Sequence, residues 1–257
     1  MGTLERVNTL PTAPPPPVRA PGLWTTPVRG RVALSALGLV LVYVAGVVVV
    51  VIGALFAASR LGAPRPDTAL LAVVLLIGTA VAALVAVRVH LLRRRGLRWA
   101  DLGLRRPERS LAHLLWQIPA VMIAGIAASA LVLAPFGVPG DAGGETLSEV
   151  DFLVSGGPVL AVIGLLAVAV VVPFAEEVVF RGVVLPALRA RFRFVGGVTL
   201  GGAAFAIVHL VPPALPYLLV VGISLCAMAE WYRSIVPGIM LHGFNNAVVF
   251  ATTLAAA

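Results

Sequence analysis

Residues 158–181 read PVLAVIGLLAVAVVVPFAEEVVFR, and this stretch decides the class of fold. Residues 158–175 carry no charged side chain, and Glu176, Glu177 and Arg181 follow. A helix that spans a bilayer needs about 20 predominantly apolar residues, and this stretch has that length. It therefore predicts a transmembrane helix that carries charge at one point along its length.

The rest of the chain has the same apolar character. Of the 257 residues, 60% are hydrophobic and only 12% are charged, whereas an average soluble protein has about 25% charged residues. A soluble enzyme and a disordered protein are thereby excluded, and a single cysteine, Cys226, excludes an internal disulfide framework. We predict an all-α fold, a polytopic transmembrane helical bundle of about seven spanning helices, at residues 32–58, 69–90, 111–134, 158–180, 195–211, 214–230 and 235–253.

The positions of the charged residues predict the orientation in the membrane. The formal net charge is +8, and the basic residues are all arginines. If the amino terminus is cytoplasmic, every arginine except Arg60 and Arg65 lies on the cytoplasmic side, as the positive-inside rule requires. The loop 135–157, on the opposite side, contains acidic residues and no arginine. The charge therefore predicts a cytoplasmic amino terminus and contact with the lipid bilayer, with no nucleic-acid partner.

Composition also divides the chain into three parts. Residues 1–31 are rich in proline and lack an apolar core, which predicts a disordered cytoplasmic tail. Residues 32–94 are expected to form two amino-terminal transmembrane helices, and residues 95–257 the functional core. We expect a multi-pass protein of the cell membrane, and the composition, rich in arginine, alanine and valine, favours the plasma membrane of a bacterium.

Polar residues interrupt the apolar segments in three places. They are Glu176, Glu177 and Arg181; Phe205 with His209; and His242 with Asn245 and Asn246. A charged side chain within a spanning helix costs about 2.5–3.5 kcal/mol on insertion scales, so these residues need an explanation. Helical spacing places Glu177 and Arg181 on one face, whereas Glu176 points about 100° away. The pattern predicts one glutamate that is paired and one that faces a cavity.

Two features of the acidic helix decide whether the three groups can meet. Pro173 lacks an N–H group and predicts a kink just before the acidic pair. A rise of about 1.5 Å per residue, counted from the cytoplasmic arginines, places Glu176, His209 and His242 near the middle of a hydrocarbon core about 30 Å thick. This convergence requires the acidic helix to continue past Arg181 toward the cytoplasmic surface.

Such a cluster is suited to hydrolysis. A carboxylate among apolar helices holds a proton readily, which suits a general base, and a nearby histidine can share that proton or orient a water molecule. A second histidine and an asparagine amide offer donors to a developing oxyanion. Glu176, His209, His242 and Asn246 therefore suffice for hydrolysis of an amide without a serine or cysteine nucleophile. The alternative interpretation is a structural network of ion pairs and hydrogen bonds between helices.

The motifs of other membrane proteases are absent from the sequence. It contains neither His-Glu-x-x-His nor Gly-x-Ser-x-Gly, and no segment presents two aspartates within the membrane.

The order and spacing of the three groups resemble the CAAX-protease and bacteriocin-processing family of intramembrane glutamic endopeptidases. The motifs are Glu-Glu-x-x-x-Arg, Phe-x-x-x-His and His-x-x-x-Asn, formed here by Glu176, Glu177, Arg181, Phe205, His209, His242 and Asn246. Residues 99–107, WADLGLRRP, are also similar to a loop often found upstream in that family. The resemblance covers roughly residues 95–253.

The resemblance implies an endopeptidase that hydrolyses a peptide bond of a membrane-associated protein or peptide, with no metal and no cofactor. Glu176 and His209 would activate the attacking water, while His242 and Asn246 would stabilise the oxyanion. Glu177 and Arg181 would position the site. Family members process prenylated CAAX proteins or bacterial peptides, including bacteriocins, and the bacterial composition disfavours a prenylated substrate.

Two rival functions stay open at this point. In the first, Glu176, His209 and His242 bind zinc, because carboxylate and imidazole are zinc ligands in proteins. In the second, the protein is a non-catalytic membrane scaffold or a bacteriocin-immunity protein that only binds a partner.

Overall fold

The computed structural model describes residues 30–64, 66–137 and 156–256. These residues form helices and no strand, which confirms the predicted all-α class. The proline-rich tail and most of the loop 135–157 lie outside the described residues. In chain order the elements are α1 Gly30–Arg60, α2 Thr68–Val87, η1 Arg88–Arg93, η2 Trp99–Leu102, η3 Leu111–His113, α3 Leu114–Leu133, η4 Ala134–Phe136, α5 Pro158–Leu166, η5 Ala167–Val171, α6 Val172–Val179, η6 Phe180–Val184, α7 Leu185–Val208, η7 Pro212–Ala214, α8 Leu215–Tyr232 and α9 Val236–Ala256.

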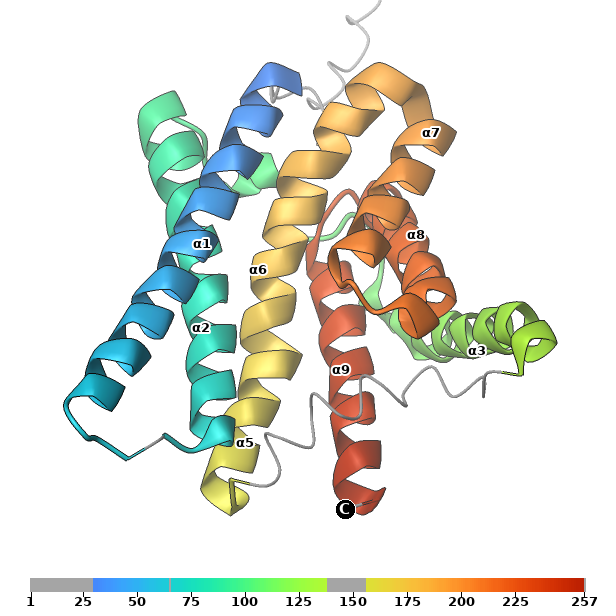
Figure 1. Ribbon diagram of the computed structural model, residues 1–257. Helices are drawn as coiled ribbons and strands as arrows, with labels where there is room; N and C mark the ends of the chain where they lie inside the picture. The colour runs from blue at the N-terminus through green and yellow to red at the C-terminus, as the bar shows by residue number, and fades with distance from the viewer. Residues whose placement is uncertain (1–29, 65, 138–155, 257) are drawn as a thin grey trace, which may run out of the picture.

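The acidic residues lie on a continuous helical segment, Pro158–Val208, that is 51 residues long. Figure 1 shows it running from α5 through α6 into α7, where the chain reverses direction. The reversal lies at Arg193, whose φ of 59° and ψ of −159° are not helical. Before the reversal, the helix continues from Glu176 through Arg181, so the predicted extension of the acidic helix is confirmed.

The number of spanning helices differs from the prediction. By length and composition, five described segments are able to cross a membrane: Gly30–Arg60, Thr68–Arg93, Leu111–Phe136, Pro158–Val208 and Pro212–Tyr232. Helix α9 is a sixth long helix, of 21 residues. The protein is therefore a multi-pass membrane protein, but with about five to six long apolar helices. The predicted count of seven is wrong.

The segment expected to span at 195–211 accounts for the difference. It is the second arm of α7, after the reversal at Arg193. Residues 194–208 measure only about 22 Å at 1.5 Å per residue, which is less than the ~30 Å of a hydrocarbon core. The arm is apolar enough for a membrane but too short to cross it alone.

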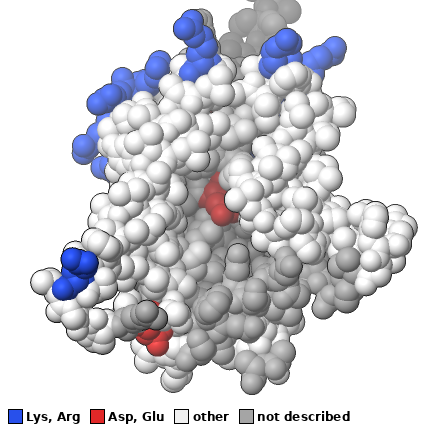
Figure 2. All heavy atoms as spheres, viewed as in Figure 1, with Lys and Arg blue, Asp and Glu red and all other residues white. Residues whose placement is uncertain are grey.

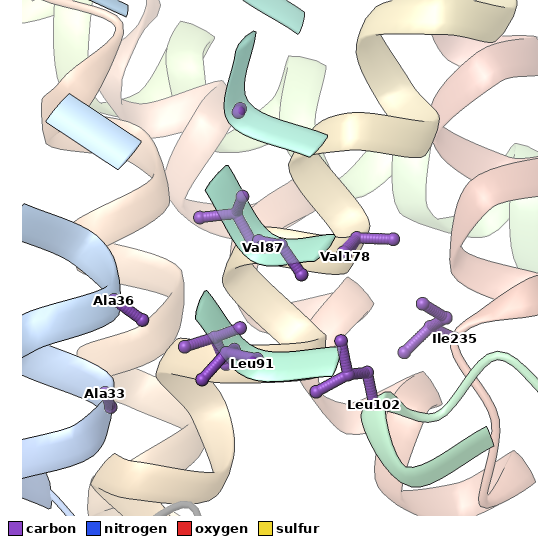
Figure 3. Close-up of a cluster of buried hydrophobic side chains, with 10 residues drawn as sticks. Ala33, Ala36, Val87, Leu91, Leu102, Val178 and Ile235 are labelled. Carbon is purple, nitrogen blue, oxygen red and sulfur yellow. The ribbon is translucent and has the colours of Figure 1, made fainter. Parts of the chain in front are cut away.

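Helices α1, α2 and α6 meet in an apolar core next to the acidic pair. Figure 3 shows this core, whose labelled members are Ala33, Ala36, Val87, Leu91, Leu102, Val178 and Ile235. Val178 is fully buried and follows Glu177 directly in the sequence. The core therefore fixes the rotation of the acidic helix about its own axis, and with it the directions in which the two glutamates point.

Helices α7 and α8 cross at unusually close range. A Cβ atom at Gly222 of α8 would lie 2.7 Å from the carbonyl oxygen of Gly202 on α7. Helix α3 packs on the other side of α8, where a Cβ at Gly125 would lie 2.6 Å from the ring of Tyr217. In Figure 1, α3 runs across the direction of α9 rather than alongside it.

The charges on the surface are segregated along the molecule. Figure 2 shows most of the visible basic side chains at one end, further basic atoms near the opposite end, and between them mainly uncharged residues around an acidic group. Arg60 ends α1, and the arginine-rich segment η1 ends the α2 helix at the other end of the α1–α2 hairpin. This separation agrees with the positive-inside pattern, and the cytoplasmic location of the basic end stays a prediction.

Candidate active site

The acidic pair lies between two π-helical turns. Helix α6 carries Glu176 and Glu177, with η5 before it and η6 after it. A π-helical turn widens the helix, and such turns often occur at functional sites. Pro173 is the second residue of α6, and α6 follows η5 directly. The predicted distortion before the acidic pair therefore takes the form of a π-helical turn.

Glu177 and Arg181 form the ion pair that their spacing predicts. Arg181 Nη1 donates to Glu177 Oε1 at 2.8 Å, and both side chains are fully buried. Arg181 Nη2 also donates to the carbonyl oxygen of Gly222 at 3.0 Å, at the close crossing of α7 and α8. The guanidinium group lies 4.6 Å from the ring centroid of Phe205. Arg181 therefore joins the acidic helix to α7 and α8.

His242 of α9 lies between the two glutamates. Its Nδ1 is 3.2 Å from Glu177 Oε1, and its Nε2 is 3.7 Å from Glu176 Oε2. Because a carboxylate only accepts hydrogen bonds, the contact with Glu177 assigns a proton to Nδ1. The Nε2 atom then faces Glu176. His242 thus holds one nitrogen against the ion pair and directs the other toward the second glutamate.

Glu176 is the accessible member of the cluster. Its side chain is 28% exposed, whereas those of Glu177 and His242 are 0% and 4% exposed. The Oε2 atom of Glu176 is buried and makes no hydrogen bond to the described residues. Figure 2 shows an acidic surface beside a hollow in the middle of an otherwise uncharged region. Glu177 is thus the paired glutamate and Glu176 the more exposed one, and a cavity facing Glu176 stays a prediction.

His209 lies at the end of α7 and reaches the cluster only through an aromatic ring. Its Nδ1 is 2.7 Å from the carbonyl oxygen of Phe205, which leaves Nε2 free of that bond. The ring of Phe205 lies 4.7 Å from that of His209 and 5.4 Å from that of His242. Among the described residues, no hydrogen bond or ion pair joins His209 to Glu176. Glu176 is therefore recorded in contact with His242, and the predicted pairing of Glu176 with His209 stays a prediction.

Asn246 binds the distorted part of the acidic helix. Its Nδ2 donates to the carbonyl oxygen of Val168 at 2.9 Å. Pro173 has no N–H group, and it removes the i+5 donor that a π-helical turn would offer to the Val168 carbonyl. A neighbouring residue of α9, Gly243, approaches the same turn so closely that a Cβ atom would overlap the carbonyl oxygen of Ala169. The absence of a side chain at Gly243 therefore allows α9 to dock on η5.

One further residue of the site, Tyr217, was not predicted from the sequence. The hydroxyl of Tyr217, on α8, donates to Asn245 Oδ1, and Asn245 Nδ2 donates to Asn246 Oδ1 at 3.3 Å. This chain of hydrogen bonds links α8 to the amide that binds Val168. Nothing in the sequence around Tyr217 marks it, because it lies 28 residues from its partner on a different helix.

The loop 99–107 holds the turn between α8 and α9. The amide of Ile235 donates to the carbonyl oxygen of Gly103 at 2.9 Å, and Arg105 Nε donates to the carbonyl oxygen of Arg233 at 2.7 Å. Leu102, from the same loop, is buried in the core beside α6. The loop therefore fixes the start of α9, which carries His242.

The arrangement has the parts of a general-base site. In the part of the chain that the structure describes, no three His, Cys, Asp or Glu side chains are grouped so that they could hold a metal ion. The partly exposed Glu176 places a carboxylate oxygen 3.7 Å from an imidazole nitrogen of His242. A carboxylate and an imidazole in this relation are able to bind and polarise a water molecule.

One of three comparisons with known proteins gives a match. Residues 158–248 match the family model described as type II CAAX prenyl endopeptidase Rce1-like. No curated protein and no solved structure matches the chain. The matched range contains the three motifs, from Glu176 to Asn246, and supports a protease. The resemblance to the CAAX-protease family that these motifs indicated is therefore confirmed, and it rests on residues 158–248.

Proposed function

We propose that this protein is an intramembrane endopeptidase in which Glu176 is the general base. The observation that carries the proposal is the 3.7 Å separation between His242 Nε2 and Glu176 Oε2, a buried oxygen of a side chain that is 28% exposed as a whole. This distance is too long for a good direct hydrogen bond, but a single water molecule is able to bond to both atoms. The family match, over the same residues, supports peptide-bond hydrolysis as the reaction.

The proposed reaction uses water as the nucleophile. Glu176 removes a proton from the water molecule, and the hydroxide that forms attacks the carbonyl carbon of the substrate. Negative charge develops on the carbonyl oxygen and is stabilised by N–H donors. When the carbon–nitrogen bond breaks, the proton held by Glu176 passes to the leaving amine. The products are a carboxylic acid and an amine, and no covalent enzyme intermediate forms.

The donors to the oxyanion are assigned to His242 and Asn246. An asparagine amide has two N–H groups, and the bond to Val168 uses one of them. His242 offers Nε2, which donates when the ring carries two protons.

The ion pair of Glu177 and Arg181 has a positioning role in this proposal. Glu177 Oε1 accepts hydrogen bonds from both Arg181 and His242, so it fixes the orientation of the imidazole ring. Such partners behind the reacting groups hold catalytic geometry. His209 completes the site from the α7 side, where its free Nε2 would bind the attacking water together with Glu176.

The substrate in this proposal is a membrane-associated protein or peptide. Glu176 lies within a helix whose surroundings are apolar, so the scissile bond must enter the membrane region to reach it. We assign the protein to the plasma membrane of a bacterium, where peptide substrates such as bacteriocin precursors fit this chemistry better than prenylated proteins.

The proposal is tested by comparing membrane peptides from cells that produce the wild-type protein or Glu176→Gln. We expect a set of peptide fragments that is present with the wild-type protein and absent with the variant, at equal amounts of the two proteins in the membrane. Identical fragments in the two cell types would overturn the proposal. If the phenotype of the cells also survives the substitution, the scaffold or immunity function is favoured instead.

A further inference from the structure

A pocket lies apart from the acidic cluster, between α1 and the end of the α2 helix. It has a volume of about 520 Å³. The residues that line it are Val32, Ser35, Ala36, Leu39, His90, Leu91, Arg94, Arg95 and Leu97. None of them belongs to the matched range 158–248, so the pocket is not part of the proposed active site.

The polar lining of this pocket is suited to an anion. Arg94 and Arg95 are both exposed, and neither forms an ion pair with another described residue. No acidic side chain lines the pocket. His90 Nε2 is buried and lacks a hydrogen-bond partner among the described residues, whereas its ring packs against Tyr43 at 5.9 Å. A buried polar atom without a partner is costly, and a ligand that accepts its hydrogen bond would satisfy it.

The remaining lining is apolar and continues onto the surface of α1. Val32 and Leu39 come from α1, and Leu91 and Leu97 from the facing segment. On α1, Val42 and Val49 come seven and fourteen residues after Ser35, which places them on the same side of the helix, and they are 63% and 67% exposed. An anion-binding end joined to an exposed apolar helix matches a molecule with a charged head and hydrocarbon chains. Basic pockets between transmembrane helices bind lipid head groups in this way.

We propose that this pocket binds the head group of an anionic phospholipid. Arg94 and Arg95 contact the phosphate, because a guanidinium group pairs with phosphate oxygens through two parallel N–H bonds. His90 Nε2 supplies a further hydrogen bond from inside the pocket. The acyl chains lie along Leu39 and the exposed face of α1. The site uses no residue of the proposed protease, so the two proposals stand or fall separately.

Binding at this site is expected to affect the stability of the whole fold. Leu91 lines the pocket and is also part of the buried core that includes Val178 of α6. A ligand that binds only the folded protein stabilises it by mass action. We therefore expect the lipid to raise the thermal stability of the purified protein.

The test is native mass spectrometry of the full chain in detergent, titrated with dioleoyl phosphatidylglycerol or dioleoyl phosphatidylcholine. The variant Arg94→Gln/Arg95→Gln should weaken binding of phosphatidylglycerol about tenfold or more. The matched control, Arg88→Gln/Arg93→Gln, removes the same charge from exposed arginines of η1 that do not line the pocket. It should bind phosphatidylglycerol nearly as well as the wild type, because Arg88 and Arg93 do not line the pocket.

Several results would overturn this assignment. If the two double variants weaken phosphatidylglycerol binding equally, the lipid is attracted to the basic end of the protein in general and not to this pocket. Equal binding of phosphatidylcholine would show that the pocket does not select an anionic head group. Displacement of the lipid by inorganic phosphate at millimolar concentration would assign the pocket to a soluble phosphate compound instead. Ser35→Leu tests the pocket without changing its charge. The larger side chain fills part of the pocket and should also weaken lipid binding. Unchanged binding would place the lipid elsewhere.

Discussion

Asn246 of α9 donates its amide to the carbonyl oxygen of Val168, inside the π-helical turn that precedes the acidic pair. This bond joins the helix that carries His242 to the helix that carries Glu176. Glu176 and His242 are the side chains proposed to share a water molecule. The Asn246 bond, four residues from His242, therefore helps to set the distance between them. Helix–helix docking and the proposed chemistry are linked at this point.

Replacing Asn246 with alanine should lower stability and activity together. A hydrogen bond between transmembrane helices contributes about 1 kcal/mol, and we expect a loss of that size in the free energy of unfolding. Peptide cleavage should fall much further, because the oxyanion donor is lost as well. Unfolding by denaturing detergent measures the first effect. Full cleavage activity in a destabilised Asn246→Ala would contradict the catalytic part of the assignment.

Gly243 should not tolerate a side chain. The Cβ atom of alanine would overlap the carbonyl oxygen of Ala169, so α9 must shift away from η5. Forcing extra atoms into a packed contact costs about 1–3 kcal/mol, and the shift also moves His242. The control is Gly53→Ala, at an open position of α1 where a Cβ meets nothing within 4 Å. Similar thermal stability and cleavage rates for the two variants would refute close docking of α9.

Removal of Arg181 should destabilise the protein strongly. Arg181→Met leaves the buried carboxylate of Glu177 without its cation, and breaking a buried pair typically costs about 3–5 kcal/mol. Adding Glu177→Gln should recover part of that loss, because the uncompensated charge is then removed. A double-mutant cycle in detergent unfolding measures the coupling. Strictly additive losses would show that the two side chains do not act as a pair.

Cleavage should survive removal of metal ions. The described residues include no group of three side chains arranged to hold a metal, so the zinc-dependent rival lacks a visible ligand set there. We expect full activity after prolonged dialysis against EDTA and 1,10-phenanthroline, with a zinc endopeptidase treated in parallel as the control. Loss of activity that zinc restores would replace the general-base assignment with a metalloenzyme.

The sequence predicted the local geometry of the site better than its long-range contacts. The pairing of Glu177 with Arg181 follows from a four-residue spacing, and it holds because both lie on one helical stretch. The bond from Asn246 to Val168 spans 78 residues of sequence. No periodicity carries that information, because it depends on how α9 docks against η5.

The predicted number of spanning helices was wrong for a different physical reason. Hydropathy shows whether a segment is apolar enough to lie in a bilayer, but it does not show where the chain reverses direction. The reversal occurs at Arg193, which adopts a positive φ, a conformation that usually favours glycine. The glycines nearby, Gly196 and Gly197, come three and four residues later, so they do not mark the position of the reversal. The arm after it is therefore shorter than its apolar run suggests. The tail 1–29 and the loop residues 138–155 lie outside the described residues, so the predictions made for them stand untested.

The central claim is that Glu176 performs the chemistry, and a turnover measurement tests it most directly. The purified protein is reconstituted in lipid nanodiscs with a peptide identified from the membrane fragments, and kcat is compared for the wild type, Glu176→Gln and Glu108→Gln. Glu108→Gln is the control, because it makes the same substitution at an exposed position. Loss of a general base typically lowers the rate about 10²–10⁴-fold, so Glu176→Gln should fall in that range while Glu108→Gln keeps the wild-type rate. A folded Glu176→Gln protein that cleaves the peptide at the wild-type rate would contradict the account.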